Sequence, residues 1–194
     1  MNLSKLLELG RTIRVVGFDD APFAKRRGAS VSVAGVVCAD TRFEGMLWGK
    51  ARRDGWNATD VISSMLDGSK FRDQVRVVLL DGIAVGGFNV IDLPALHART
   101  GLTCVSVMRK MPDLAAMRAV IERLPNPPRR LELLARAGEI HRRAPFTFQV
   151  QGEDPDVTER LLVRFTREGH VPECLRMAHL IGSAVMLGES GRRA

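Results

Sequence analysis

The order of predicted strands and helices constrains the fold of this chain more than any other feature. Five segments rich in apolar and β-branched residues have the pattern of strands, at residues 12–19, 30–39, 42–50, 76–80 and 102–108. No helical pattern separates the first three, whereas one precedes each of the last two. Because parallel neighbours need a long crossover and antiparallel neighbours do not, this order predicts three antiparallel strands followed by two parallel strands.

The second half of the chain has mainly helical periodicity. Helices are predicted at residues 113–124, 129–137, 155–167 and 172–187, and residues 146–151 could form a further strand. No linker is long enough to divide the chain, so residues 1–194 are predicted to form a single domain. The element order is that of an RNase H-like fold, by analogy. We therefore expect an α/β protein with a five-stranded mixed sheet flanked by helices.

Two of the predicted strands end on aspartate. Asp19 closes an apolar run at the first strand, and Asp81 closes the run at the fourth strand. A carboxylate at the end of a buried strand is unfavourable unless it is paired, hydrogen-bonded or bound to a cation. If the two strands are neighbours, the carboxylates suit Mg²⁺ or Mn²⁺ at the carboxyl edge of the sheet. Each aspartate could instead cap a helix or turn, and Asp81 followed by Gly82 is a common turn dipeptide.

Other polar residues could complete such a site. Asp20 adjoins Asp19, but alternation along a strand would direct it to the opposite face. Asp54 follows the third strand, and Asn57 has the position of a helix N-cap. His179 lies in an apolar helical context, where a lone histidine is more often a packed core residue than a catalyst.

The charge of the chain favours a polyanionic partner. Formal net charge is +7 and the estimated pI is 10.1, a balance common among proteins that bind nucleic acid but not specific to them. A basic loop, residues 25–27, could contact phosphates, although such clusters are usually solvated. The glycine-rich segment 82–87 lacks the lysine of a phosphate-binding P-loop and is better explained by close backbone approach.

The cysteines and the hydropathy pattern indicate the cellular setting. Cys38, Cys104 and Cys174 form no C-x-x-C pair and are odd in number, so we expect buried free thiols rather than a zinc site. No apolar run approaches the length of a membrane span, and the first residues lack the apolar core of a secretory signal. The expected location is therefore the cytoplasm.

Several short motifs, taken together, resemble the archaeal endonuclease dU family, which is related to endonuclease V. They run in the family's order across nearly the whole chain. The matching segments are GFDDAPF at 17–23, DGWNAT at 54–59, LDGI at 80–83, GFNVID at 87–92, PECLRMAHLI at 172–181 and GES at 188–190.

The resemblance implies an endonuclease V-like domain that hydrolyses phosphodiester bonds near deaminated bases, with Mg²⁺ or Mn²⁺ as cofactor. Deoxyuridine is the implied lesion, and DNA is the expected partner rather than RNA. Carried over by position, the catalytic residues are Asp19, Asp81, Asp54 and His179, the first three of them metal ligands. For the third ligand, which precedes the first helix of the fold, either Asp54 or Asn57 is the nearest match by position. The expected substrate-binding residues are Lys25, Arg26, Arg27, Gly82 and Asn57.

The chain departs from the pattern of its relatives at two places. Family members usually carry aspartate where this chain has Asn57, and an amide oxygen can bind a metal but brings no charge. The Pro-Tyr-Ile-Pro segment with which endonuclease V separates strands around a lesion is absent, and the chain has no tyrosine. An alternative function is therefore a non-catalytic nucleic-acid-binding protein of the same fold. A weaker alternative is a nucleotide-binding protein that uses the 82–87 loop.

Overall fold

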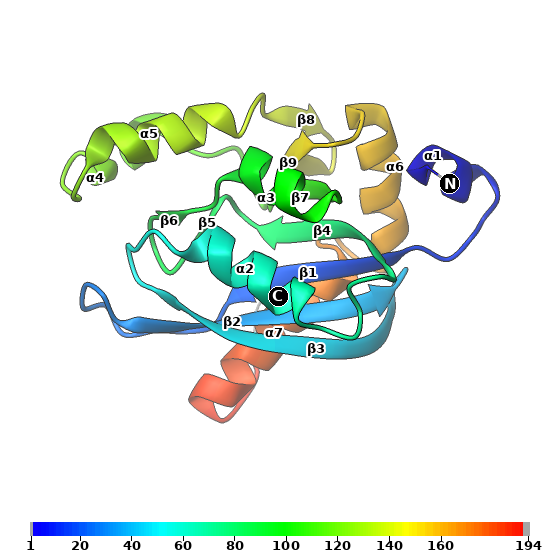
Figure 1. Ribbon diagram of the computed structural model, residues 1–194, viewed down its shortest axis with the longest axis horizontal. Coiled ribbons are helices and arrows are strands. Elements are labelled where there is room, and N and C mark those ends of the chain that lie inside the picture. Colours follow the sequence, from blue (N-terminus) through cyan, green and yellow to red (C-terminus); the bar gives the residue numbers. More distant parts are fainter. Residues whose placement is uncertain (1, 192–194) are drawn as a thin grey trace.

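The computed structural model describes residues 2–191, and its centre is a seven-stranded mixed sheet in the order β3-β2-β1-β4-β7-β9-β8 (Figure 1). The strands of this sheet are β1 (Arg14–Asp20), β2 (Ser30–Ala39), β3 (Arg42–Arg52), β4 (Val75–Asp81), β7 (Thr103–Met108), β8 (His141–Arg143) and β9 (Phe146–Gln151). A separate two-stranded hairpin pairs β5 (Ala84–Val85) with β6 (Asn89–Val90). The helices are α1 (Leu3–Glu8), α2 (Ala58–Asp67), α3 (Leu93–Thr100), α4 (Leu114–Ile121), α5 (Pro127–Arg136), α6 (Pro155–Phe165) and α7 (Glu173–Leu187).

The predicted order of strand directions is confirmed, but the predicted number of strands is wrong. Strands β1, β2 and β3 form an antiparallel meander, and β1, β4 and β7 are parallel. The sheet has seven strands instead of five because β9 pairs antiparallel with β7, and β8 pairs with β9. The segment of β8 is only three residues long and carries polar side chains, so its sequence has no strand pattern.

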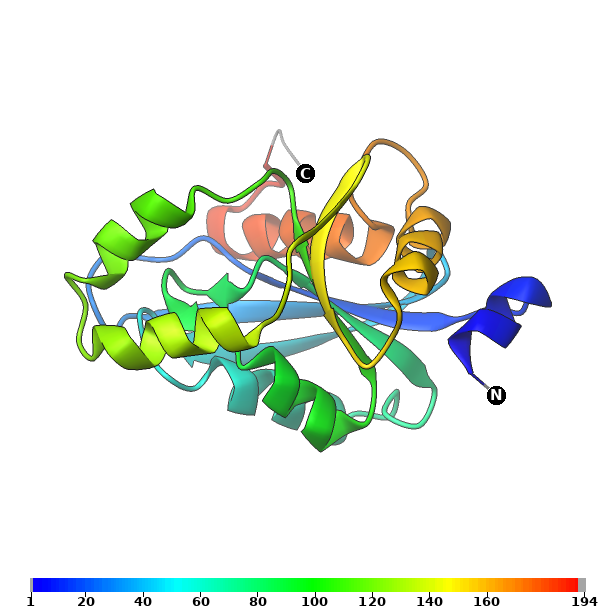
Figure 2. The same cartoon turned by 90° about the horizontal axis from the view of Figure 1, so that it is seen from above.

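Helices cover both faces of the sheet (Figure 2). One core lies between the sheet and α2 and α3, with Leu133 and Leu134 of α5 packed against it. The other core lies beneath α6 and α7 and includes Leu3 of α1. The strands β1, β2, β4 and β7 therefore have apolar side chains on both faces, which is why they appear in the sequence as nearly continuous apolar runs.

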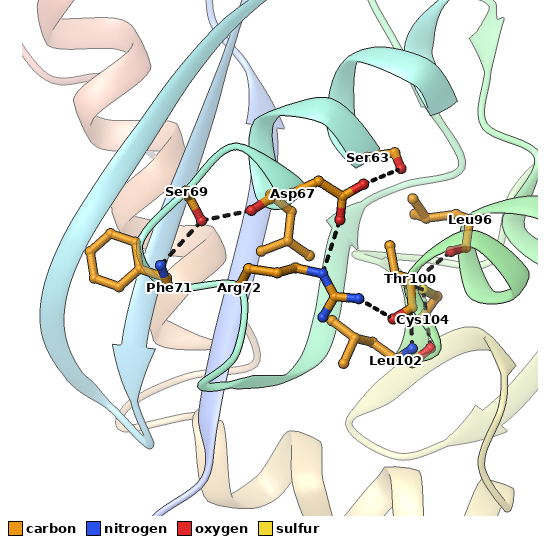
Figure 3. Close-up of polar contacts among 10 residues, drawn as sticks. Ser63, Asp67, Ser69, Phe71, Arg72, Leu96, Thr100, Leu102 and Cys104 are labelled. Atoms are coloured by element: carbon orange, nitrogen blue, oxygen red, sulfur yellow. Dashed lines mark hydrogen bonds and ion pairs between the residues drawn. The ribbon is translucent and has the colours of Figure 1, made fainter.

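A polar network holds the ends of α2 and α3 together at one edge of the sheet (Figure 3). Arg72, in the loop after α2, donates to Asp67 at 2.9 Å and to the Thr100 carbonyl at 2.6 Å. Thr100 ends α3, so this arginine joins two helices whose apolar sides share one core. The network lies at the amino ends of β4 and β7. Asp19 and Asp81 lie at the opposite edge of the sheet, at the carboxyl ends of β1 and β4.

The pair α4 and α5 extends beyond the carboxyl ends of β4 and β7 (Figures 1 and 2). Much of α4 is exposed, and only Ile121 of it is buried. Within residues 2–191, no helix has the length and apolarity that crossing a membrane requires.

Candidate metal centre and the adjoining cavity

The register of the two central parallel strands brings Asp19 and Asp81 together. Phe18 of β1 is paired with Leu80 of β4, and an aspartate follows each of them. Alternation along the strands directs both carboxylates toward the face covered by α7, the face to which Val15 and Leu79 also belong. Two parallel strands that end at the same level therefore place two acids side by side at the carboxyl edge.

Helix α7 adds His179 to this pair. The helix packs closely on β1 because Gly17 has no side chain: a Cβ there would lie 2.7 Å from the Cys174 Sγ and 2.9 Å from the Leu175 nitrogen. At this approach His179 Nδ1 lies 2.9 Å from Asp19 Oδ2. One ligand atom each of Asp19, Asp81 and His179 lies within 4.8 Å of the others.

The carboxylates of this cluster repel one another. The pKa of Asp19 is raised from 3.8 to about 8, first by burial and then by the neighbouring charges of Asp81 and Asp20, against smaller opposing effects of a backbone hydrogen bond and of Arg109. Asp19 is buried, with 7% of its surface exposed. A cation bound between Asp19 and Asp81 would therefore stabilise the ionised form of both carboxylates.

Arg109 is the one member of the site that the sequence interpretation missed. Its guanidinium lies 2.9 Å from Asp81 Oδ2 and is partly exposed. Arg109 directly follows β7, so the reasoning that selected residues at the ends of β1 and β4 would also have found it. The ion pair balances the charge of Asp81, whereas Asp19 has no arginine or lysine partner among residues 2–191.

Asp20 and Gly82 lie next to this cluster and shape the loop after β4. As expected from alternation, Asp20 points to the opposite face, where its carboxylate accepts a hydrogen bond from the Gly86 nitrogen. Burial is the largest cause of the raised pKa of Asp20. Gly82 has φ of +83° and donates to the Val107 carbonyl at 2.8 Å, so its place in the turn requires glycine.

The structure places Asp54 outside the cluster. Its Oδ1 accepts from the Phe88 nitrogen at 2.9 Å, and its Oδ2 lies 3.3 Å from Arg53 Nε. The group of possible ligands that includes Asp19 does not include Asp54 within residues 2–191. A residue after β3 reaches the loop before β6 instead, because β3 runs along the outer edge of the sheet and β2 and β1 separate it from β4.

Asn57 has a structural role at the start of α2. Its side-chain oxygen accepts from the Arg52 nitrogen at 3.1 Å and from Asn89 Nδ2 at 2.9 Å. It is the N-cap residue by position, yet it is the Asn89 Oδ1 that accepts the hydrogen bond from the Ala58 nitrogen, at 3.0 Å. The sequence pattern therefore located the helix start correctly and assigned the capping bond to the wrong asparagine.

Arg130 of α5 joins the same loops. The residue is fully buried, lies 4.0 Å from the ring centre of Trp56, and donates to the carbonyls of Asp54 at 2.5 Å and Gly55 at 3.3 Å. It also donates to the Phe88 carbonyl. Burial lowers the pKa of Arg130, and the nearby Asp54 opposes this. This one side chain therefore fixes α5 against the segments that precede α2 and β6.

The helices α4 and α5 enclose a cavity of about 610 Å³ beside the metal centre. Its walls come from the loop after β4, from Met108 at the end of β7, from α4 and α5, and from Gln149 of β9. Gly82 and Met108 are direct chain neighbours of Asp81 and Arg109. The cavity and the acidic cluster thus lie on the two sides of the same sheet edge.

The predicted basic loop is exposed and lies near this edge. Residues 25–27 connect β1 to β2, and the loop is held where Gly28 donates to the Arg53 carbonyl at 3.3 Å. Cys38, Cys104 and Cys174 are buried free thiols, as the sequence predicted. None of the three belongs to the cluster.

Comparison with known proteins places this geometry in a family. The sequence profile described as endonuclease dU matches residues 11–186. The chain belongs to the endonuclease dU family. A UPF0215 protein of Methanothermobacter thermautotrophicus is 41% identical to it over 183 residues, which cover 92% of this chain and 90% of the relative.

Two solved structures have a similar fold. The crystal structure of a protein of unknown function from Archaeoglobus fulgidus is 35% identical and has a TM-score of 0.84, covering 89% of this chain and 98% of its own. Endonuclease V of Ciona intestinalis, in complex with a DNA that contains an inosine followed by a ribo-adenosine, has a TM-score of 0.57 at 14% identity. That alignment covers 88% of this chain and 84% of the Ciona chain, and shows that the endonuclease dU fold is similar to the fold of endonuclease V.

Proposed function

We propose that this member of the endonuclease dU family is a metal-dependent endonuclease that hydrolyses a phosphodiester bond near a deaminated base, deoxyuridine first among them. The observation that carries the proposal is the convergence of Asp19, Asp81 and His179 within 4.8 Å at the carboxyl edge of the sheet. The family assignment and the similarity to endonuclease V support nuclease chemistry. The strand directions agree with an RNase H-like fold, which we keep as part of the proposal.

The residues of the cluster fit a divalent cation. Hard carboxylate oxygens are the ligands that Mg²⁺ and Mn²⁺ prefer, and an imidazole nitrogen is compatible with Mn²⁺. Asp19 is buried beside the carboxylates of Asp81 and Asp20, and both the burial and these charges raise its pKa, so a bound cation would stabilise its ionised form. Asp19 and Asp81 would hold the ion, which when bound lowers the pKa of water and neutralises charge on a phosphate. Asp54 is not part of this proposal because its carboxylate is used by Phe88 and Arg53.

The protein's own groups have distinct tasks in this proposal. With Nδ1 donating to Asp19, His179 presents Nε2 as an acceptor that can take a proton from attacking water. Arg109 can leave Asp81 when the charge there is balanced and donate to an oxygen of the scissile phosphate. The exposed basic loop of residues 25–27 would hold the strand through other phosphates.

A DNA strand is the favoured substrate. The Ciona endonuclease V was crystallised with DNA, and a net charge of +7 favours a long polyanion over a free nucleotide. The experiment offers labelled single and double strands of DNA and RNA, each with uracil, hypoxanthine or no lesion, to the folded protein with Mg²⁺, Mn²⁺ or EDTA. We expect cleavage of uracil-containing DNA that needs the metal ion.

The variants for this experiment are chosen as a pair. Asp81→Asn should abolish cleavage while leaving the protein folded, because it removes one charge from the cluster. Asp60→Asn is the matched control: Asp60 is an exposed aspartate that pairs with Arg99 and does not belong to the cluster of possible ligands. Strand binding without cleavage of any substrate would favour the non-catalytic nucleic-acid-binding alternative. Normal cleavage by Asp81→Asn would refute the assignment of the metal centre.

A further inference from the structure

The cavity beside the metal centre has the size and position of a nucleobase site. Its volume of about 610 Å³ lies within the range of roughly 300–1,000 Å³ that is common for small-molecule sites. It begins at Gly82, one residue from Asp81, and at Met108, one residue from Arg109. A strand whose phosphate lies at the acidic cluster can therefore reach across the sheet edge and place a base in the cavity.

The walls of the cavity are mostly apolar. Ile83, Phe88, Met117 and Leu134 line it, which suits the flat face of an unstacked base. The polar side chains among its lining residues are those of Arg118 and Gln149. A guanidinium can only donate, so an acceptor for a ring N–H has to come from Gln149 or from the backbone.

The amide of Gln149 is held in one orientation. Its Nε2 donates to the Gly138 carbonyl at 2.7 Å, and because a carbonyl only accepts, the nitrogen must face it. Gln149 is 5% exposed, so the side chain has little freedom to turn. Its Oε1 accepts no hydrogen bond in the described part of the chain, and Gln149 is one of the residues that line the cavity.

A second unsatisfied polar group lies beside it. Ser106 of β7 is paired with Gln149 across the two strands, so both side chains point to the same face of the sheet. Its Oγ is one of the buried side-chain atoms without a partner among residues 2–191. Ser106 does not itself line the cavity, so of these two groups only the Gln149 amide can meet a ligand bound there.

We propose that Gln149 is a specificity-determining residue whose Oε1 accepts the ring N–H of a base bound in this cavity. The proposal rests on the proposed function and names how its site would recognise the lesion. Deamination converts the acceptor ring nitrogen of cytosine or adenine into an N–H, at N3 of uracil and at N1 of hypoxanthine. Gln149 Oε1 attracts the N–H and repels the lone pair of the parent base. Thymine and guanine also carry a ring N–H, so this contact distinguishes deaminated bases from their parents only.

The test measures binding in the absence of a metal ion, so that no strand is cut. Fluorescence anisotropy follows labelled single strands of adenine and cytosine only, with uracil, 3-methyluracil or cytosine at one central position, in EDTA. The uracil is then the only base with a ring N–H, and 3-methyluracil replaces that hydrogen with a methyl group. We expect wild type to bind the uracil strand roughly 3- to 10-fold more tightly than the other two, the value of one hydrogen bond.

Two variants separate this contact from a structural role. Gln149→Met keeps the length of the side chain without an acceptor and should bind all three strands equally. Gln151→Met is the matched control, because Gln151 lies on the same strand and donates to the Ala137 carbonyl at 3.4 Å but does not line the cavity. It should keep the preference for uracil.

The outcomes distinguish this inference from the proposed function. Failure of wild type to bind any strand overturns this inference, whereas the proposed function is overturned only by the absence of metal-dependent cleavage. Equal binding of the three strands by wild type overturns the role of Gln149 but not the proposed function. This outcome is measured on wild type, so it does not depend on the folding of a variant. A preference for uracil that persists in Gln149→Met also overturns it.

Discussion

Replacing Asp19 with asparagine should make the metal-free protein more stable while removing its proposed activity. The pKa of this carboxyl rises from 3.8 to about 8 on folding, so the folded protein holds the proton more tightly than the unfolded chain. Stability therefore falls as the pH rises from about 4 to about 8, since ionisation is easier in the unfolded state. The asparagine variant lacks this penalty and should gain most at the upper end of that range.

The magnitude follows from the size of the shift. About four pKa units, each equivalent to about 1.4 kcal/mol, set an upper limit of about 6 kcal/mol at pH 8 and about 2 kcal/mol at pH 5. Entry of water and movement of side chains relieve part of this, so we expect roughly half of each value. For a protein of this size, a gain of about 3 kcal/mol raises the Tm by about 6–12 °C.

The assay is urea and thermal unfolding in EDTA at pH 5 and pH 8. Asp40→Asn is the contrasting variant, because Asp40 accepts from the Ile13 nitrogen at 3.0 Å and pairs with Arg164 at 2.8 Å, so its change should destabilise by about 1–2 kcal/mol. Adding Mg²⁺ at pH 8 should raise the Tm of wild type more than that of Asp19→Asn. If Asp19→Asn is no more stable than wild type at pH 8, or if its gain is the same at both pH values, the reasoning about Asp19 is refuted.

Three further changes test the surroundings of the site. Arg109→Gln removes a cation that competes for Asp81, so Mg²⁺ should bind about three- to tenfold more tightly by calorimetric titration; unchanged affinity would exclude competition. Arg130→Met leaves three backbone carbonyls without their donor and should lower the free energy of unfolding by about 3–5 kcal/mol, measured with urea; a loss below about 1 kcal/mol would contradict the role given to Arg130. Asp54→Asn keeps an acceptor for the Phe88 nitrogen, so cleavage should stay within about threefold of wild type; a loss as large as that of Asp81→Asn would make Asp54 a metal ligand.

The sequence by itself determined the centre of the sheet and two of the acidic residues. Continuous apolar runs predicted β1 and β4, and the helical pattern between the strands predicted that β4 and β7 are parallel. That β1 and β4 are neighbours was a condition that the structure supplied; given that pairing, the convergence of Asp19 and Asp81 follows from local rules, because parallel strands end at the same edge and residues alternate between faces. The same rule would have included Arg109, the first residue after β7.

The tertiary structure alone decided the remaining partners. His179 reaches Asp19 across 160 positions of the chain because α7 packs against the Gly17 backbone. Asp54 has the sequence position of a ligand, yet β3 is an edge strand and delivers it to the Phe88 nitrogen. Gln149 belongs to β9, which pairs antiparallel with β7 although α4 and α5 lie between the two strands in the chain, so the rule that a helical crossover gives parallel neighbours does not predict this pairing. Local periodicity specifies where a segment ends and which face a residue takes, whereas packing between distant segments decides which of those residues meet.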